Sequence, residues 1–157
     1  HATVLPVLLT GGVAAAAAAA DVLTKAWAIA NAGTPRPIIP GVPSTTLTTN
    51  TGAVFGLFRG NAEVLAAVSV LIMAAVLAFW WLEGRRSTLL SVAVGLLIGG
   101  ALGNLWGRVT QGYVVDFLHL DVVPWWPAFN VADVATVAGV ALALGWMLGQ
   151  RPAQEAR

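Results

Sequence analysis

Two aspartates, Asp116 and Asp133, stand out in a chain that carries very little charge. They bracket the apolar and aromatic stretch 113–133, YVVDFLHLDVVPWWPAFNVAD. Two carboxyl groups brought close together in a low-dielectric site do not both ionise comfortably, so one of them keeps a proton. Such a pair can hydrolyse a peptide bond, because the ionised member can deprotonate a water while the protonated member donates to the carbonyl oxygen.

Other roles are open for the same residues. Asp133 can cap a helix, since acids are common in the first helical turn, and Asp116 can be an interfacial acid bonded to backbone, as we expect for Asp121. Ionisable groups within a membrane also form proton or ion pathways. We expect His119 at the surface and no metal site, because the chain offers few donors. Spacing alone therefore does not decide between catalysis and these alternatives.

The composition predicts the kind of protein that must position these acids. Of the 157 residues, 58% are hydrophobic and 10% are charged, against roughly 25% charged in an average soluble domain. This is the composition of an integral membrane protein with a single domain. The net charge of +1 and the lack of a dense Lys/Arg patch argue against a nucleic-acid partner. Without cysteine, a disulfide framework or a thiol nucleophile is excluded.

Four apolar runs are long enough to cross about 30 Å of hydrocarbon as helices. We therefore predict an all-α membrane protein with four transmembrane helices and a small extracytoplasmic β element. The predicted spans cover residues 4–30, 62–82, 88–105 and 131–148. Asn61 and Asn130 are the expected N-caps of the second and fourth spans.

The first span contains an alanine-rich block that also resembles the cleavage region of a signal peptide. We favour a span, because the run lacks a basic leader and continues in helical pattern through Asp21 and Lys25. These two residues are four positions apart and are expected to pair on one helix face. The pair is either a salt bridge at the water boundary or a support for a site, since ionisable groups within a span usually face the protein interior.

Between the first two spans, residues 33–60 are expected to lie outside the membrane. Four prolines in 35–43 forbid continued helix. The following stretch, 44–58, is rich in Thr, Val and Phe and predicts one or two short strands, with a turn at Asn50 to Gly52. A small extracytoplasmic sheet on four helices is the expected arrangement.

Arginine positions give an orientation for the four spans. Four arginines lie on one side of the predicted topology, Arg85, Arg86, Arg151 and Arg157, against three on the other, Arg36, Arg59 and Arg108. The positive-inside rule makes the first side cytoplasmic, so both termini are expected inside. Tryptophans fall into two groups, as expected for belts at the two interfaces: Trp27, Trp106, Trp125 and Trp126, and Trp80, Trp81 and Trp146.

The third span carries glycines at intervals of four residues, Gly95, Gly99 and Gly103. Side chains four positions apart lie on the same helix face, so this spacing forms a smooth stripe. A stripe of small residues lets a neighbouring backbone approach closely. It predicts packing rather than catalysis.

Five short motifs, taken together, resemble one family. They are DVLTK (21–25), NTGAVFG (50–56), GGALGN (99–104) followed by Arg108, GYVVDF (112–117) and PAFNVAD (127–133). In this order and across four spans they resemble the lipoprotein signal peptidases, or signal peptidase II, which are bacterial aspartic proteases of the inner membrane.

The resemblance implies roles for individual residues. Asp116 and Asp133 match the catalytic aspartates. Six further residues match positions that line, brace or support the site: Asn50, Asn104, Arg108, Asn130, Asp21 and Lys25. The implied substrate is a prolipoprotein whose cysteine already carries diacylglycerol, cut just before that cysteine at the outer leaflet. No metal or organic cofactor is implied, and we expect a monomer surrounded by membrane lipid.

Two positions depart from the family pattern. Gly107 stands where the family usually has an acid before the arginine of GNLxDR, and Val22 stands where it commonly has Gln. We expect Gly107→Asp to raise activity or stability by giving Arg108 a partner. The alternative to an active protease is a non-catalytic membrane protein, either a pseudoenzyme that binds lipidated signal peptides or a small proton-linked transport module.

Overall fold

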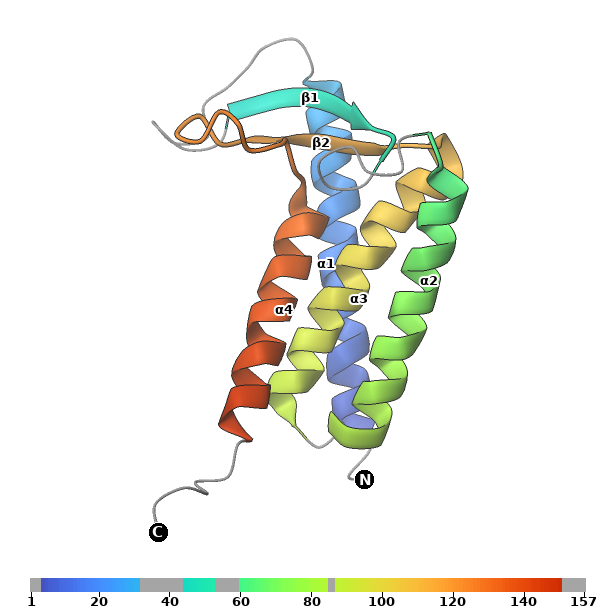
Figure 1. The fold of residues 1–157 in the computed structure, drawn as a ribbon, viewed down its shortest axis with the longest axis vertical. Coiled ribbons are helices and arrows are strands. Elements are labelled where there is room, and N and C mark those ends of the chain that lie inside the picture. The colour runs from blue at the N-terminus through green and yellow to red at the C-terminus, as the bar shows by residue number, and fades with distance from the viewer. Residues whose placement is uncertain (1–3, 32–43, 53–59, 85–86, 151–157) are drawn as a thin grey trace.

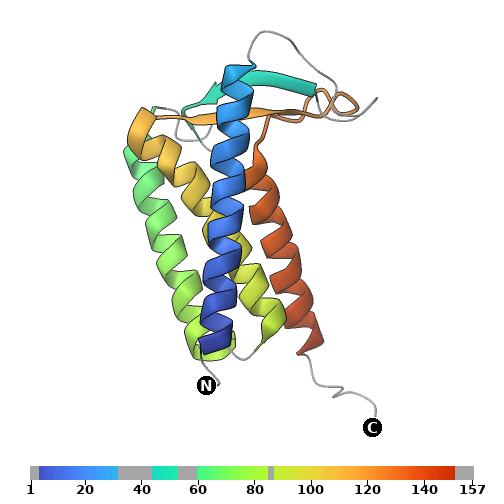
Figure 2. The same ribbon diagram turned by 180° about the vertical axis from the view of Figure 1, so that it is seen from behind.

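Four helices form a bundle, and a two-stranded sheet lies across one end of it (Figure 1). The computed structural model describes residues 4–31, 44–52, 60–84 and 87–150. The elements are, in order, α1 (Val4–Ala30), β1 (Ser44–Asn50), α2 (Ala62–Phe79), the π-helical turn η2 (Trp80–Gly84), α3 (Thr88–Gln111), β2 (Val114–His119) and α4 (Val131–Gly149). The start of α1 and the end of α4 both lie at the end of the bundle opposite the sheet (Figures 1 and 2).

In the described part of the chain, four helices are long and apolar enough to cross a membrane. They are Val4–Ala30, Ala62–Glu83, Thr88–Gln111 and Val131–Gly149. Most of their apolar side chains point outward, and in α2 the one buried residue is Leu65. Outward apolar faces suit lipid, so the predicted fold class, a four-span helical membrane protein with a small β element, is confirmed.

The central helix is α3, and its glycines let both neighbours approach. A Cβ added at Gly95 would meet Val13 Cβ at 2.7 Å, and one added at Gly99 would meet Ala14 O at 2.6 Å. On another face, a Cβ at Gly100 would lie 2.5 Å from Ala132 O. The predicted glycine stripe therefore packs against α1, and a further glycine brings α4 into contact.

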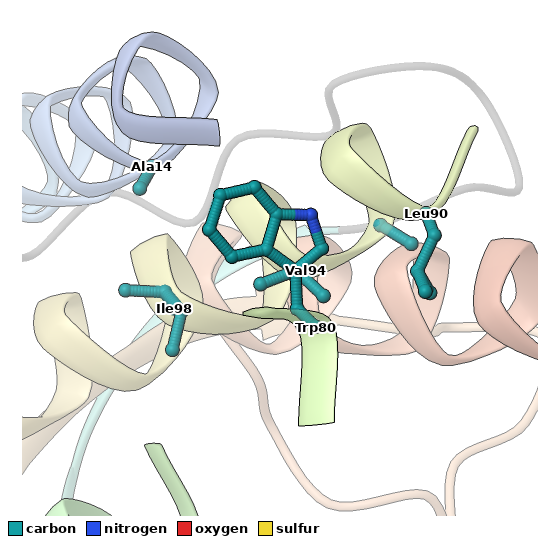
Figure 3. Packing of buried hydrophobic residues seen from close by; sticks show 6 residues of the cluster. Ala14, Trp80, Leu90, Val94 and Ile98 are labelled. Atoms are coloured by element: carbon teal, nitrogen blue, oxygen red, sulfur yellow. The ribbon is translucent and has the colours of Figure 1, made fainter. Parts of the chain in front are cut away.

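The buried apolar cluster lies in the half of the bundle away from the sheet. Its members are Ala14, Trp80, Leu90, Ala93, Val94 and Ile98 (Figure 3). Trp80, the first residue of the π-helical turn, turns its indole into this cluster and donates from Nε1 to Ser91 Oγ at 3.1 Å. The expectation that Trp80 belongs to the interfacial belt is therefore wrong, because the turn directs its ring inward.

Two helix ends differ from the sequence predictions. α3 continues to Gln111 instead of ending near residue 105, and it stops at Gly112, whose φ of 78° is the left-handed conformation that favours glycine. The apolar run ends near residue 105, but the helix continues through the more polar residues that follow. A helix need not end where it leaves the hydrocarbon. At α2, Asn61 holds the N-cap position but makes no side-chain capping bond.

The sheet pairs β1 with β2 in antiparallel orientation, with Thr48 opposite Asp116 and Asn50 opposite Val114. A bulge between Thr45 and Thr48 adds one residue to β1. The sequence predicted a strand within 44–58 but not β2. Asp116 lies on this second strand, a few residues after the end of α3.

Several sequence-based predictions fall outside the described residues. They concern the proline-rich stretch 35–43, the second half of NTGAVFG (53–56) and six of the seven arginines used for orientation, Arg36, Arg59, Arg85, Arg86, Arg151 and Arg157.

Candidate active site

Asp116 and Asp133 reach the same region from different elements. Asp116 sits in the middle of β2 with 3% of its surface exposed, whereas Asp133 is half-buried in the first turn of α4. β2 runs past the top of the bundle, and the chain returns beside it because Phe129 pairs with Leu118 in an isolated bridge. That pairing delivers the next residue, Asn130, to the side of Asp116.

Asn130 contacts both aspartates. It is fully buried and begins α4 with a capping box, in which its Oδ1 accepts from Asp133 N at 2.9 Å and its N donates to Asp133 Oδ2 at 3.0 Å. Its Nδ2 donates to Asp116 Oδ1 at 2.7 Å. The helix cap that Asp133 was expected to serve is therefore real, and the same bonds tie it to Asp116.

Asn104 and Lys25 extend this network into the bundle. Asn104 Nδ2 donates to Asp133 Oδ1 at 2.9 Å, and Asn104 Oδ1 accepts from both Asn130 Nδ2 and Lys25 Nζ at 3.0 Å. Lys25 Nζ also lies 2.6 Å from Asp21 Oδ2, so the predicted pair is present. Both residues are buried, which excludes the alternative of a salt bridge at the water boundary.

Asp21 joins α1 to the first turn of α4. Its side chain is fully buried, and its Oδ1 accepts from the backbone N of Ala132 at 2.9 Å. That N–H belongs to the first turn of α4 and has no acceptor within the helix. The fit requires Gly103, because a Cβ there would lie 2.5 Å from Asp21 Oδ2.

Asn50 and Arg108 connect the sheet to the aspartates. Asn50 Nδ2 donates to Asp116 Oδ2 at 3.1 Å, while Asn50 Oδ1 accepts from Gly52 N at 2.9 Å, which makes the predicted turn. Arg108 donates from Nη2 to Gly52 O at 3.3 Å. The end of β1 is thereby held between α3 and Asp116.

These contacts overturn the expected benefit of Gly107→Asp. Arg108 already donates to Gly52, and a Cβ at Gly107 would lie 2.7 Å from the carbonyl oxygen of Tyr113. The obstacle is backbone, so the turn after α3 would have to move. Glycine at this position allows close packing, and the substitution is expected to destabilise the protein.

The electrostatics of Asp116 suit a carboxyl group that holds a proton. Its pKa is raised from 3.8 to about 6, first by burial and then by the negative charge of Asp133. Hydrogen bonds from Asn50 and Asn130 oppose the shift. Asp133 lies in the first turn of α4, where the positive end of the helix dipole stabilises a negative charge.

A cavity of about 210 Å³ extends from the site along the bundle. Asn104 and Arg108 line it together with apolar side chains of α2 and α3, including Ile72 and Met73, and with Thr136 of α4. The cavity is therefore polar at Asn104 and Arg108, where it meets the network, and mostly apolar elsewhere. Sequence reasoning missed these wall residues, because lipid-facing and cavity-facing positions of an apolar span look alike.

All eight residues singled out in the sequence thus belong to one connected set of hydrogen bonds. His119 and Asp121 lie outside this set and face each other, with His119 Nδ1 3.7 Å from Asp121 Oδ1. Among the described residues no three His, Cys, Asp or Glu side chains gather as metal ligands.

Comparison with known proteins decides the family. The model of signal peptidase (SPase) II matches residues 13–149, most of the chain. The chain belongs to the signal peptidase II family. It is therefore a peptidase of a multi-pass membrane family.

Individual relatives of the signal peptidase II family agree. The lipoprotein signal peptidase of Thermosynechococcus vestitus is 40% identical over 84% of this chain and 86% of its own length. That of Pseudomonas putida is 45% identical over 68% and 67%, and that of Clostridium acetobutylicum is 38% identical over 78% and 82%. Two solved structures of bacterial membrane enzymes superpose with TM-scores of 0.83 and 0.79 at 28% and 29% identity. They cover 94% and 90% of this chain, and 92% and 94% of their own.

Proposed function

We propose that this protein is an aspartic endopeptidase that removes signal peptides from diacylglyceryl-modified prolipoproteins, cutting just before the lipidated cysteine. The relatives named lipoprotein signal peptidases support the substrate class. The observation that carries the aspartic mechanism is that one buried residue, Asn130, donates to both carboxyl groups, from Nδ2 to Asp116 and from its backbone N to Asp133. A shared asparagine holds the two carboxyl groups within one site.

In the proposed reaction Asp133 is the general base and Asp116 the general acid. Asp133 takes a proton from water as the water oxygen attacks the scissile carbonyl carbon, and Asp116 gives its proton to the carbonyl oxygen. The C–N bond then breaks as Asp133 passes its proton to the leaving amine, and a hydroxyl of the intermediate returns a proton to Asp116. Each carboxyl group ends in its starting state.

The position of the pair suits a substrate anchored in lipid. A diacylglyceryl cysteine sits at the membrane surface with its acyl chains in the bilayer, and both aspartates lie where the sheet meets the helices. The apolar cavity below Asn104 and Arg108 offers room for an apolar part of the substrate. We place the pair near the outer leaflet of the bacterial inner membrane, with both termini cytoplasmic.

The hydrogen bonds that join the site residues lie within one chain, so the proposed mechanism needs no group from a second copy, and we propose that the protein acts as a monomer. The supporting residues serve the aspartates in this proposal: Asn50, Asn104 and Asn130 donate to them, Arg108 holds the end of β1, and Asp21 with Lys25 fixes the helix ends. No observation favours the alternatives of a binding-only pseudoenzyme or a transport module.

The test is cleavage of a diacylglyceryl-modified prolipoprotein by the purified protein in detergent or vesicles. The wild type should release the signal peptide, and Asp116→Asn and Asp133→Asn should each abolish release. The aspartic mechanism fails if either variant still cleaves at the wild-type rate. A wild type that binds the substrate without cleaving it would favour a pseudoenzyme.

A further inference from the structure

The side chain of Asn104 can donate or accept a hydrogen bond, and its two ends have different neighbours. Its Nδ2 donates to Asp133 Oδ1, whereas its Oδ1 accepts from Lys25 Nζ and Asn130 Nδ2. If this amide turned by 180°, it would present an oxygen to Asp133 in place of a donor. The state of Asp133 therefore depends on what holds the amide of Asn104.

Lys25 is suited to hold it, because an ammonium group only donates. Asn130 holds the second lone pair of the same oxygen, and its own orientation is fixed by the bond it accepts from Asp133 N. We propose that Lys25 is a positioning residue for the aspartate pair, which locks Asn104 so that its amide donates to Asp133. This inference rests on the proposed function, in which Asp133 must be ionised to act as the base.

A purely structural ion pair explains less of the geometry. Lys25 and Asp21 are both on α1, four residues apart, so their bond alone ties no other element to that helix. Burying an ion pair contributes little net stability, because desolvation offsets the attraction. Lys25 nevertheless reaches across to α3, where it bonds Asn104 and approaches Gly103 O at 3.5 Å.

The charged groups around Asp133 come from three other elements. They are Asp116 on β2, Arg108 on α3, and Asp21 with Lys25 on α1. The carboxylate of Asp21, 2.6 Å from Lys25 Nζ, offsets most of the ammonium charge. Lys25 thus acts on Asp133 by its charge, which Asp21 opposes, and through the orientation of Asn104.

A double-mutant cycle tests this route. All variants carry Asp21→Asn, which keeps an acceptor for Ala132 N and avoids a buried carboxylate without its partner. In this background Lys25→Met should lower kcat about tenfold, a coupling in the range found for residues of one hydrogen-bond network. It should also move the acidic limb of the pH profile to higher pH. With Asn104→Ala added, Lys25→Met should have a much smaller effect, because only the direct attraction between the ammonium group and Asp133 then remains.

Full additivity of Lys25→Met and Asn104→Ala, or an unshifted pH profile, would overturn the proposal. Thr24→Val is the matched control, since Thr24 lies beside Lys25 and its hydroxyl donates to the backbone carbonyls of Ala20 and Asp21 within α1. It should leave the profile unchanged.

A second measurement separates this inference from the proposed function. In ¹³C NMR spectra of the full chain in micelles, the carboxyl signal of Asp133 should titrate at higher pH in Asp21→Asn/Lys25→Met than in Asp21→Asn. This difference should be much smaller when both proteins also carry Asn104→Ala, because the direct charge of Lys25 acts in either case. Equal differences with and without Asn104, or no difference, would contradict the positioning role, whether or not the protein cleaves. If the wild type does not cleave the substrate, the proposed function is wrong, whereas the NMR result on Asp133 is unaffected.

Discussion

The carboxylate of Asp21 in α1 accepts a hydrogen bond from the backbone N of Ala132 at 2.9 Å, across 111 positions of sequence. That bond fixes the first turn of α4, and Asp133 is the next residue. Asp21, which pairs with Lys25 on α1, therefore helps to fix the position of Asp133, a proposed catalytic residue. Neither Asp21 nor Lys25 bonds to the Asp133 carboxylate directly.

The first prediction concerns this cap. Asp21→Ala should lower the melting temperature more than Asp21→Asn, because asparagine keeps an oxygen for Ala132 N while alanine removes it. Both lose the partner of Lys25, so the difference isolates the cap, with an expected cost of about 1 kcal/mol. Thermal unfolding in detergent measures it, and equal melting temperatures would show that the cap contributes nothing.

The second prediction concerns Asn130. Asn130→Ala removes the side-chain cap of α4 and the Nδ2 donor to Asp116, while the backbone N–H that donates to Asp133 remains. We expect activity to fall at least about 100-fold, as when a preorganised donor at a reacting group is lost. Ser87→Ala is a control, since Ser87 caps α3 through Leu90 N outside the active-site network. It should lower stability by a similar amount and leave cleavage intact. Equal losses of activity in the two variants would mean that Asn130 serves only as a cap.

The third prediction follows from the raised pKa of Asp116. An acid whose pKa is raised by folding stabilises the folded state at low pH, and this contribution is lost as pH rises from about 4 to about 6. Cleavage should likewise decline as pH rises through about 6, since Asp116 donates the proton. Asp133→Asn should lower the pKa of Asp116, because the negative charge of Asp133 contributes to the shift.

The carboxyl ¹³C signal of Asp116 measures this directly in wild type and Asp133→Asn. A midpoint near 4 in the wild type, or the same midpoint in both proteins, would contradict the assigned electrostatics.

The fourth prediction concerns close packing at glycines. Gly103→Ala should lower the melting temperature, because its Cβ would lie 2.5 Å from Asp21 Oδ2, and Gly107→Asp should do so because of Tyr113 O. Gly12→Ala is the matched control, with no atom within 4 Å of an added Cβ, and helix propensity favours it. If the melting temperature were unchanged in Gly103→Ala and Gly107→Asp, the packing around these glycines would be looser than the distances to an added Cβ indicate.

Much of the bundle follows from local pattern. Hydrophobic length predicted four spans, and the spacing of Gly95, Gly99 and Gly103 predicted the face that another helix approaches. Both predictions depend on patterns among residues that are close together in the sequence. The cap at Asn130 was also predictable, since an asparagine three residues before an acid is a helix-start signal.

Elements that depend on long-range pairing were harder to predict. β2 was missed because six residues between two apolar stretches look like part of a loop, although Val114 and Val115 favour a strand and Gly112 marks the end of a helix. The geometry argues against the benefit expected of Gly107→Asp for a similar reason. The carbonyl of Tyr113 that blocks it is placed by the turn after α3, which the sequence pattern does not specify.

The most direct test of the central claim is the cleavage rate of a diacylglyceryl-modified prolipoprotein by wild type, Asp116→Asn and Asp133→Asn, each checked for an unchanged fold. We expect release of the signal peptide by the wild type alone. Undiminished cleavage by either asparagine variant would contradict the claim that the two aspartates carry out the reaction.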